Sequence, residues 1–96
     1  MKRSEILDTA KRVVCADRKD MHGRAEDSFC GIAHLWAAYL DMDISPVDVA
    51  AMMILLKIAR AKENPMHMDN FVDMCGYAAC GGEIAEEIWG TEGLDV

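Results

Sequence analysis

The chain has 96 residues, enough for one domain with one modest core and too few for a second. Hydrophobic residues make up 52% of it, while aromatic residues are few and only two prolines occur, which argues against a β-sandwich or barrel. The formal net charge of −7 argues against general nucleic-acid binding and against binding to anionic membranes, because both require a basic surface.

The four cysteines stand at positions 15, 30, 75 and 80, without a Cys-x-x-Cys pair. We therefore expect buried, reduced thiols in place of disulfides or a zinc site. The N-terminus shows no signal peptide, and no apolar run reaches the ~18 residues of a membrane span. These features predict a cytosolic protein.

The first predicted helix covers residues 4–16, with Ser4 as its N-cap and a single apolar stripe. Residues 17–27 form a charged loop that holds three of the ten Lys and Arg residues, Arg24 among them. A solvated connector and a ligand-binding loop are both consistent with this composition. The second helix is predicted over residues 28–41, capped by Asp27 or Ser28, with Trp36 in its apolar stripe.

The third predicted helix, residues 46–63, has the clearest start in the chain. Ser45 is the N-cap, Pro46 occupies the first position, and Asp48 stands where a capping box places its acidic residue. From Val49 to Leu56 no residue is polar, and a helix that is apolar on all sides is buried on all sides. Three other helices are too few to cover it, so we expect a homo-oligomer in which a second subunit covers the remaining side.

Asn64-Pro65 ends this helix, since the residue before proline avoids the α region. The fourth helix is predicted over residues 68–88, with a kink or break allowed at Gly81-Gly82. Its predicted packing face is a stripe of mostly small side chains: Phe71, Cys75, Ala78, Ala79, Gly82 and Ala85. Residues 90–96 are a tail. Residues 1–96 thus form a single all-α domain, similar to a four-helix bundle and completed by oligomerisation.

Three groups of polar residues carry possible chemistry: Lys57 with Arg60, His67 with Asp69, Asp73 and Tyr77, and the loop residues Arg18, Lys19, His22 and Arg24. Lys57 and Arg60 share one helix face, either as dipole-compensating cations at a helix end or as a phosphate clamp. Asp69, Asp73 and Tyr77 step by four residues, so they also share a face. The two carboxylates are tentative Mg²⁺ ligands, or they neutralise Lys57 and Arg60 across the helix interface.

Several stretches carry a resemblance to a known family: Asp17-Arg18 with Gly23, the run Phe29 to Leu40, the run Asp48 to Arg60, and the run His67 to Ala79. Over residues 5 to about 88 the chain resembles a phage- and prophage-encoded all-helical family of uncharacterised function. That family is distantly similar to MazG-like nucleotide pyrophosphohydrolases and to phage nucleotide-modification proteins.

MazG-like enzymes hold Mg²⁺ with a Glu-x-x-Glu on one helix and an acidic pair on another. The resemblance implies that Asp69 and Asp73 correspond to the second pair, whereas the first pair has no counterpart, because Glu26 and Asp27 only precede an apolar stripe. Loss of half the metal site argues against hydrolysis. A nucleotide pocket retained without catalysis would suit a counter-defence protein in the host cytosol that sequesters a nucleotide immune signal.

Our leading hypothesis is therefore a homo-oligomer that binds a small phosphorylated nucleotide without turnover and without a required cofactor. Its cations would contact phosphates, its rings would stack on a base, and its carboxylates would accept hydrogen bonds. The candidate ligand-binding residues are Arg18, His22, Arg24, Trp36, Lys57, Arg60, His67, Asp69, Asp73 and Tyr77. The alternatives are a Mg²⁺-dependent nucleotide pyrophosphohydrolase, which would use Asp69 and Asp73, and an acidic module that binds or inhibits another protein.

Overall fold

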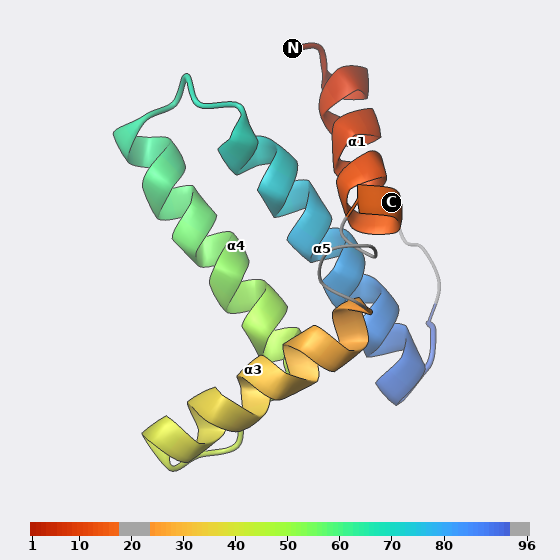
Figure 1. Ribbon diagram of the computed structural model, residues 1–96, viewed down its shortest axis with the longest axis vertical. Coiled ribbons are helices and arrows are strands. Elements are labelled where there is room, and N and C mark those ends of the chain that lie inside the picture. The colour runs from red at the N-terminus through yellow and green to blue at the C-terminus, as the bar shows by residue number, and fades with distance from the viewer. Residues whose placement is uncertain (18–23, 93–96) are drawn as a thin grey trace.

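The computed structural model describes residues 1–17 and 24–92, which form helices joined by short connections and contain no strand (Figure 1). This confirms the predicted all-α single domain. The elements in chain order are α1 (Arg3–Arg12), a π-helical turn η1 (Val13–Asp17), α3 (Ala25–Leu40), α4 (Pro46–Glu63) and α5 (Asp69–Trp89). None of the described helices is both long and apolar enough to cross a membrane.

The helices α4 and α5 form an antiparallel hairpin, and α1 packs on the far side of α5 (Figure 1). The helix α3 crosses the open end of this hairpin, where α4 begins and α5 ends (Figure 1). The three helices α1, α5 and α4 therefore form one layer, and α3 packs across one end of it. This arrangement leaves much of α4 covered only by α5.

The hydrophobic core lies at the crossing of α3 with the hairpin. Its most completely buried large side chains are Phe29 and Val49, and the buried residues Ala33, Ala50, Cys80 and Ile84 pack around them. Within the apolar run of α4, only Val49 and Ala50 are buried, whereas the Leu55 side chain is 63% exposed. One chain therefore buries the start of α4 and leaves the outward side of its middle in solvent.

The start of α4 is built as the sequence predicts. The backbone N–H of Asp48 donates to Ser45 Oγ at 3.0 Å, and the Ser45 N–H donates to Asp48 Oδ2 at 2.9 Å. Pro46 occupies the first helical position. Two backbone donors that a helix start leaves without partners are thus satisfied reciprocally.

The predicted caps of the first two helices are wrong. The helix α1 begins at Arg3, and the N–H of the preceding Lys2 donates to Glu5 Oε1 at 3.1 Å, so Ser4 lies inside the first turn. The helix α3 begins at Ala25, after Arg24, so Asp27 is also inside the helix. In both helices acidic side chains in the first turn favour the start through the helix dipole, even though neither helix has a Ser, Thr, Asp or Asn cap.

The helix α5 runs without a break through Gly81 and Gly82. Its buried face also differs from the predicted small-residue stripe, because Gly81 is buried while Ala78 and Gly82 are exposed. A Cβ added at Gly81 would lie 2.8 Å from the Ala50 Cβ. A glycine at this position therefore lets α4 and α5 approach closely.

The prediction that the cysteines are buried is correct for only one of the four. All four are free thiols, yet Cys15 and Cys30 are exposed, Cys75 is half-buried, and only Cys80 is buried. Cys80 belongs to the core cluster, where it acts as a small hydrophobic side chain.

We expect Ser45→Ala to lower the free energy of unfolding by about 1 kcal/mol, because the Asp48 N–H loses its side-chain acceptor. The matched control is Ser4→Ala, in the exposed first turn of α1, which should change stability by less than ~0.5 kcal/mol. Urea denaturation of both variants measures the difference. Equal losses would show that the capping box does not determine where α4 begins.

Candidate functional site

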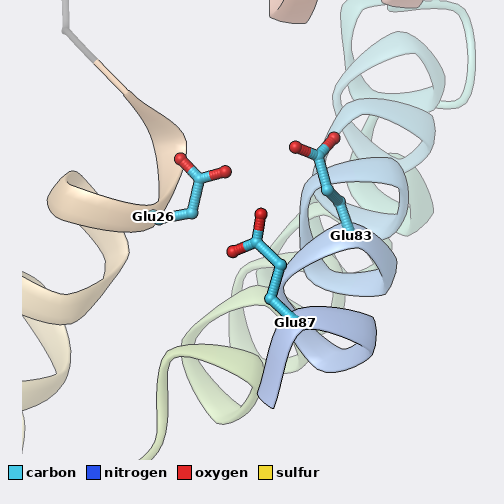
Figure 2. A group of neighbouring side chains, drawn as sticks. All are labelled: Glu26, Glu83 and Glu87. Atoms are coloured by element: carbon cyan, nitrogen blue, oxygen red, sulfur yellow. The ribbon is translucent and has the colours of Figure 1, made fainter. Parts of the chain in front are cut away.

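Three glutamates from two helices point toward one another at the α3–α5 crossing (Figure 2). Glu26 lies in the first turn of α3, and Glu83 and Glu87 lie one turn apart near the end of α5. One carboxylate oxygen from each lies within 4.8 Å of those of the other two. We call these residues the carboxylate cluster. Like charges at this spacing repel, and a divalent cation with oxygen ligands would relieve that repulsion.

Arg24 flanks the cluster. Its Nε donates to Glu26 Oε2 at 3.3 Å, and this contact raises the pKa of Arg24. The pKa of Glu26 is lowered, first by a hydrogen bond from its own backbone and then by Arg24. Any stability from these contacts is therefore present above the ordinary pKa of Glu26, 4.5, and is lost as the pH falls through its lower folded value. At neutral pH the Glu26 carboxylate is ionised and able to bind a cation.

A pocket of about 360 Å³ lies beside the carboxylate cluster. Arg24, Glu26 and Glu83 provide its charged wall. Small or apolar side chains form the rest: Val14, Cys15, Ala25, Ala79 and Cys80. Its volume falls in the range of small-molecule sites, roughly 300 to 1,000 Å³. The described residues thus place a group of oxygen ligands at the edge of a ligand-sized pocket.

Farther along α5, Asp73 pairs with Lys57 of α4. The Lys57 Nζ lies 2.7 Å from Asp73 Oδ2, and the side chains are 13% and 33% exposed, respectively. The sequence left open whether Asp73 binds a metal or neutralises a cation, and in this structure its carboxylate contacts the Lys57 ammonium. Ten residues separate Asp73 from Glu83, which corresponds to roughly 15 Å along a helix. The ion pair and the carboxylate cluster are therefore separate features.

Asp73 also borders a second, smaller cavity. Its volume is about 60 Å³, and its walls come from α1, η1, α3 and α5. Tyr77 and Phe29 line it, with their ring centroids 6.2 Å apart. Such a volume holds a few water molecules and not a nucleobase. Tyr77 packs against the hydrophobic core at this position.

The remaining predicted ligand residues lie at two places in the fold, one in α3 and the other at the end of the α4–α5 hairpin where the two helices are connected. Trp36 packs against the core. Arg60 is exposed in the last turn of α4, His67 is exposed in the α4–α5 connection, and Asp69 is exposed in the first turn of α5. Their roles in ligand binding stay predictions.

Of the predicted loop residues, only Arg24 can be placed, since Arg18 and His22 lie outside the described residues. Arg24 borders the pocket of about 360 Å³. It is therefore the one predicted ligand residue that the described structure brings to the carboxylate cluster.

Glu83 and Glu87 were not predicted from the sequence as candidate cation ligands, and Glu26 was considered only as a possible counterpart of the MazG-like Glu-x-x-Glu. The spacing of Glu83 and Glu87 could have indicated a pair of ligands, because two acids four residues apart share a helix face. The convergence of Glu26 with this pair depends on how α3 crosses α5, which no local spacing encodes.

We expect a double-mutant cycle of Lys57→Met and Asp73→Asn to give a coupling energy of about 1–2 kcal/mol. The pair is partly buried, so it should exceed a typical exposed salt bridge of about 0–1 kcal/mol. Chemical denaturation of the wild type, both single variants and the double variant measures it. A coupling energy of zero would mean that the contact adds nothing to stability.

Two phage proteins are similar to this chain. Gene 55 protein of Mycobacterium phage D29 is 45% identical over 82 residues, which cover 85% of this chain and 54% of that protein. Gene 55 protein of Mycobacterium phage L5 is 47% identical over 74 residues, covering 76% and 47%, respectively. The chain spans about half the length of these curated relatives. No solved structure shows significant similarity to it.

The matching family is described as "Domain of unknown function (DUF6378)", and the match covers residues 5–85. It includes most of α1, all of α3 and α4 and most of α5, and therefore Glu26 and Glu83, whereas Glu87 lies just beyond it. With the phage relatives, this match supports the predicted resemblance to a phage family and does not extend to MazG-like enzymes. The chain belongs to the DUF6378 family.

Proposed function

We propose that this protein binds a small phosphorylated nucleotide in the pocket between α3 and α5, through a divalent cation held by the carboxylate cluster. The observation that carries the proposal is the convergence of Glu26, Glu83 and Glu87 within 4.8 Å, beside a pocket of about 360 Å³. Mg²⁺ is the expected cation, since it binds through a few carboxylates and completes its shell with water and phosphate oxygens.

Charge explains why a cation is needed. A phosphate group that approached Glu26, Glu83 and Glu87 alone would meet three negative charges on a chain of net charge −7. A divalent cation reverses the sign of the interaction, because it is the largest local charge in such a site. Arg24, with a side chain 65% exposed, is placed to contact a second phosphate. The proposal thus adds Mg²⁺ to the cofactor-free binding that the sequence suggested.

The pocket walls suit the rest of a nucleotide. Ala25, Ala79 and Cys80 present small side chains, so a flat base has room to lie against them. We propose that the nucleotide is retained without turnover, as a sequestering protein would require. The phage origin of the relatives supports a counter-defence role, in which the ligand is a nucleotide signal of the host.

Isothermal titration calorimetry against a nucleotide panel tests the proposal. The panel contains nucleoside triphosphates, cyclic dinucleotides and ADP-ribose-type compounds, each in Mg²⁺ and in EDTA. At least one nucleotide should bind in Mg²⁺ and not in EDTA. If every compound fails in both conditions, while the protein has a salt-sensitive protein partner, the acidic interaction module is the better interpretation.

Hydrolysis is the second candidate function, and the same three carboxylates favour it. A metal held by carboxylates can activate water and stabilise a transferring phosphoryl group, which is the chemistry that the resemblance to MazG-like pyrophosphohydrolases implies. Incubation of the bound nucleotide with the protein and Mg²⁺, followed by mass spectrometry, separates the two functions. Recovery of intact nucleotide supports sequestration, and pyrophosphate release supports catalysis.

A further inference from the structure

The helix α4 carries an apolar stripe on the side that faces away from α5. Its members are Ala51, Met52, Leu55, Ile58 and Ala59, all exposed, and we call them the α4 stripe. Met52, Leu55 and Ile58 are 39%, 63% and 43% exposed, respectively. Their spacing of three and four residues places them on one face of the helix. Among the described helices, α5 and α3 are the main neighbours of α4, and Figure 1 shows its other side open.

The total accessible surface of the chain is larger than that of a typical monomer of its mass. It is 7142 Å² for a mass of 10.6 kDa, whereas monomeric proteins of that mass expose roughly 5,500 Å². The excess of roughly 1,600 Å² matches one partner's share of a homodimer interface, which buries about 2,000–5,000 Å² in total. A surplus of this size leaves room for a second protein surface of ordinary dimension against the exposed stripe of α4.

We propose that the partner is a second copy of this chain, with the two copies of α4 packed antiparallel about a two-fold axis through Leu55. Asp48 lies seven residues before Leu55 and Lys62 seven residues after it, and both are exposed. The two-fold axis therefore brings Asp48 of each copy beside Lys62 of the other. Opposite charges meet at both ends of an apolar contact.

The α4 stripe is also symmetric about Leu55. Ala51 and Ala59 lie four residues to either side of Leu55, and Met52 and Ile58 lie three residues to either side. In the antiparallel dimer Ala51 of each copy faces Ala59 of the other, so the helices can approach closely at those points. A parallel pairing would place Asp48 beside Asp48 and Lys62 beside Lys62, and like charges would oppose it. The sequence of α4 thus selects the antiparallel register.

Sedimentation equilibrium of three proteins tests the dimer. The wild type should be a dimer, and Leu55→Glu should raise the dimer dissociation constant at least tenfold, because two carboxylates would meet on the axis. Leu7→Glu is the matched control, since Leu7 is an exposed leucine on α1 (58% exposed), and it should stay dimeric. Circular dichroism should show equal helix content in all three. A monomeric wild type, a Leu55→Glu variant whose dissociation constant rises less than tenfold, or a Leu7→Glu variant weakened as much as Leu55→Glu would overturn the proposal.

Cysteine cross-linking tests the register, with the exposed Cys15 and Cys30 changed to serine. Oxidation of Leu55→Cys should give a covalent dimer, because position 55 meets itself on the axis. Met52→Cys alone should not cross-link, since its two copies are offset by six residues, about 9 Å along the helices and beyond the reach of a disulfide. A dimer in which Met52→Cys cross-links and Leu55→Cys does not would overturn the proposed register.

Discussion

Replacing Glu83 with Gln is expected to weaken Mg²⁺-dependent nucleotide binding by at least roughly tenfold. Glu83 belongs to the carboxylate cluster and also lines the pocket, so the variant loses one ionised ligand of the cation at the edge of the site. The neutral amide keeps the size of the side chain and removes its charge. Calorimetry in Mg²⁺ with the best nucleotide of the panel measures the change.

Glu86→Gln is the matched control for this prediction. Glu86 is an exposed acid on the same turn of α5 and does not belong to the carboxylate cluster, so the variant has the same net charge as Glu83→Gln. Its affinity should equal that of the wild type. If the two variants lose affinity equally, the cation does not bind at the cluster and responds only to the overall charge of the protein.

Gly81→Ala is expected to be less stable than Gly82→Ala by about 1–3 kcal/mol. Both substitutions add one methyl group within α5 and gain the same helix propensity, about 1 kcal/mol. At Gly81 the new Cβ would lie 2.8 Å from the Ala50 Cβ, so α4 and α5 must separate, whereas at Gly82 nothing lies within 4 Å. The difference between the variants isolates the cost of overpacking.

Thermal and urea denaturation of both glycine variants measure this difference. Gly82→Ala should be at least as stable as the wild type, because it meets open space in an exposed part of the helix. Equal stability of the two variants would mean that the α4–α5 contact at Gly81 is loose enough to accept a methyl group without rearrangement.

Local chemistry explains which parts of the fold were predictable. The start of α4 was predicted correctly because Ser45, Pro46 and Asp48 act within one turn of the chain and need no partner from elsewhere. The end of α4 at Glu63, just before Asn64, follows in the same way from the proline at position 65. The first two helix starts were misplaced because acidic side chains in the first turn, together with the dipole, favour a start without a typical cap residue.

The buried face of α5 and the candidate site were less predictable, because both depend on helix crossing. Gly81 is buried against Ala50 only because α4 lies close to it, and Glu26 meets Glu83 only because α3 crosses near the end of α5. Asp73 and Lys57 were grouped correctly as neighbours, since their helices form a hairpin. Their grouping into a ligand site with Arg60 and Asp69 stays a prediction.

Paramagnetic broadening by Mn²⁺ tests the central claim most directly, because Mn²⁺ also prefers oxygen ligands and its effect depends on distance. Amide NMR spectra would be recorded with Mn²⁺ alone and with Mn²⁺ plus nucleotide. The account predicts that broadening is centred on residues 24–28 and 80–89, around Glu26, Glu83 and Glu87, and persists when nucleotide is added. Broadening centred on residues 57–73, around Lys57, Asp69 and Asp73, would contradict it.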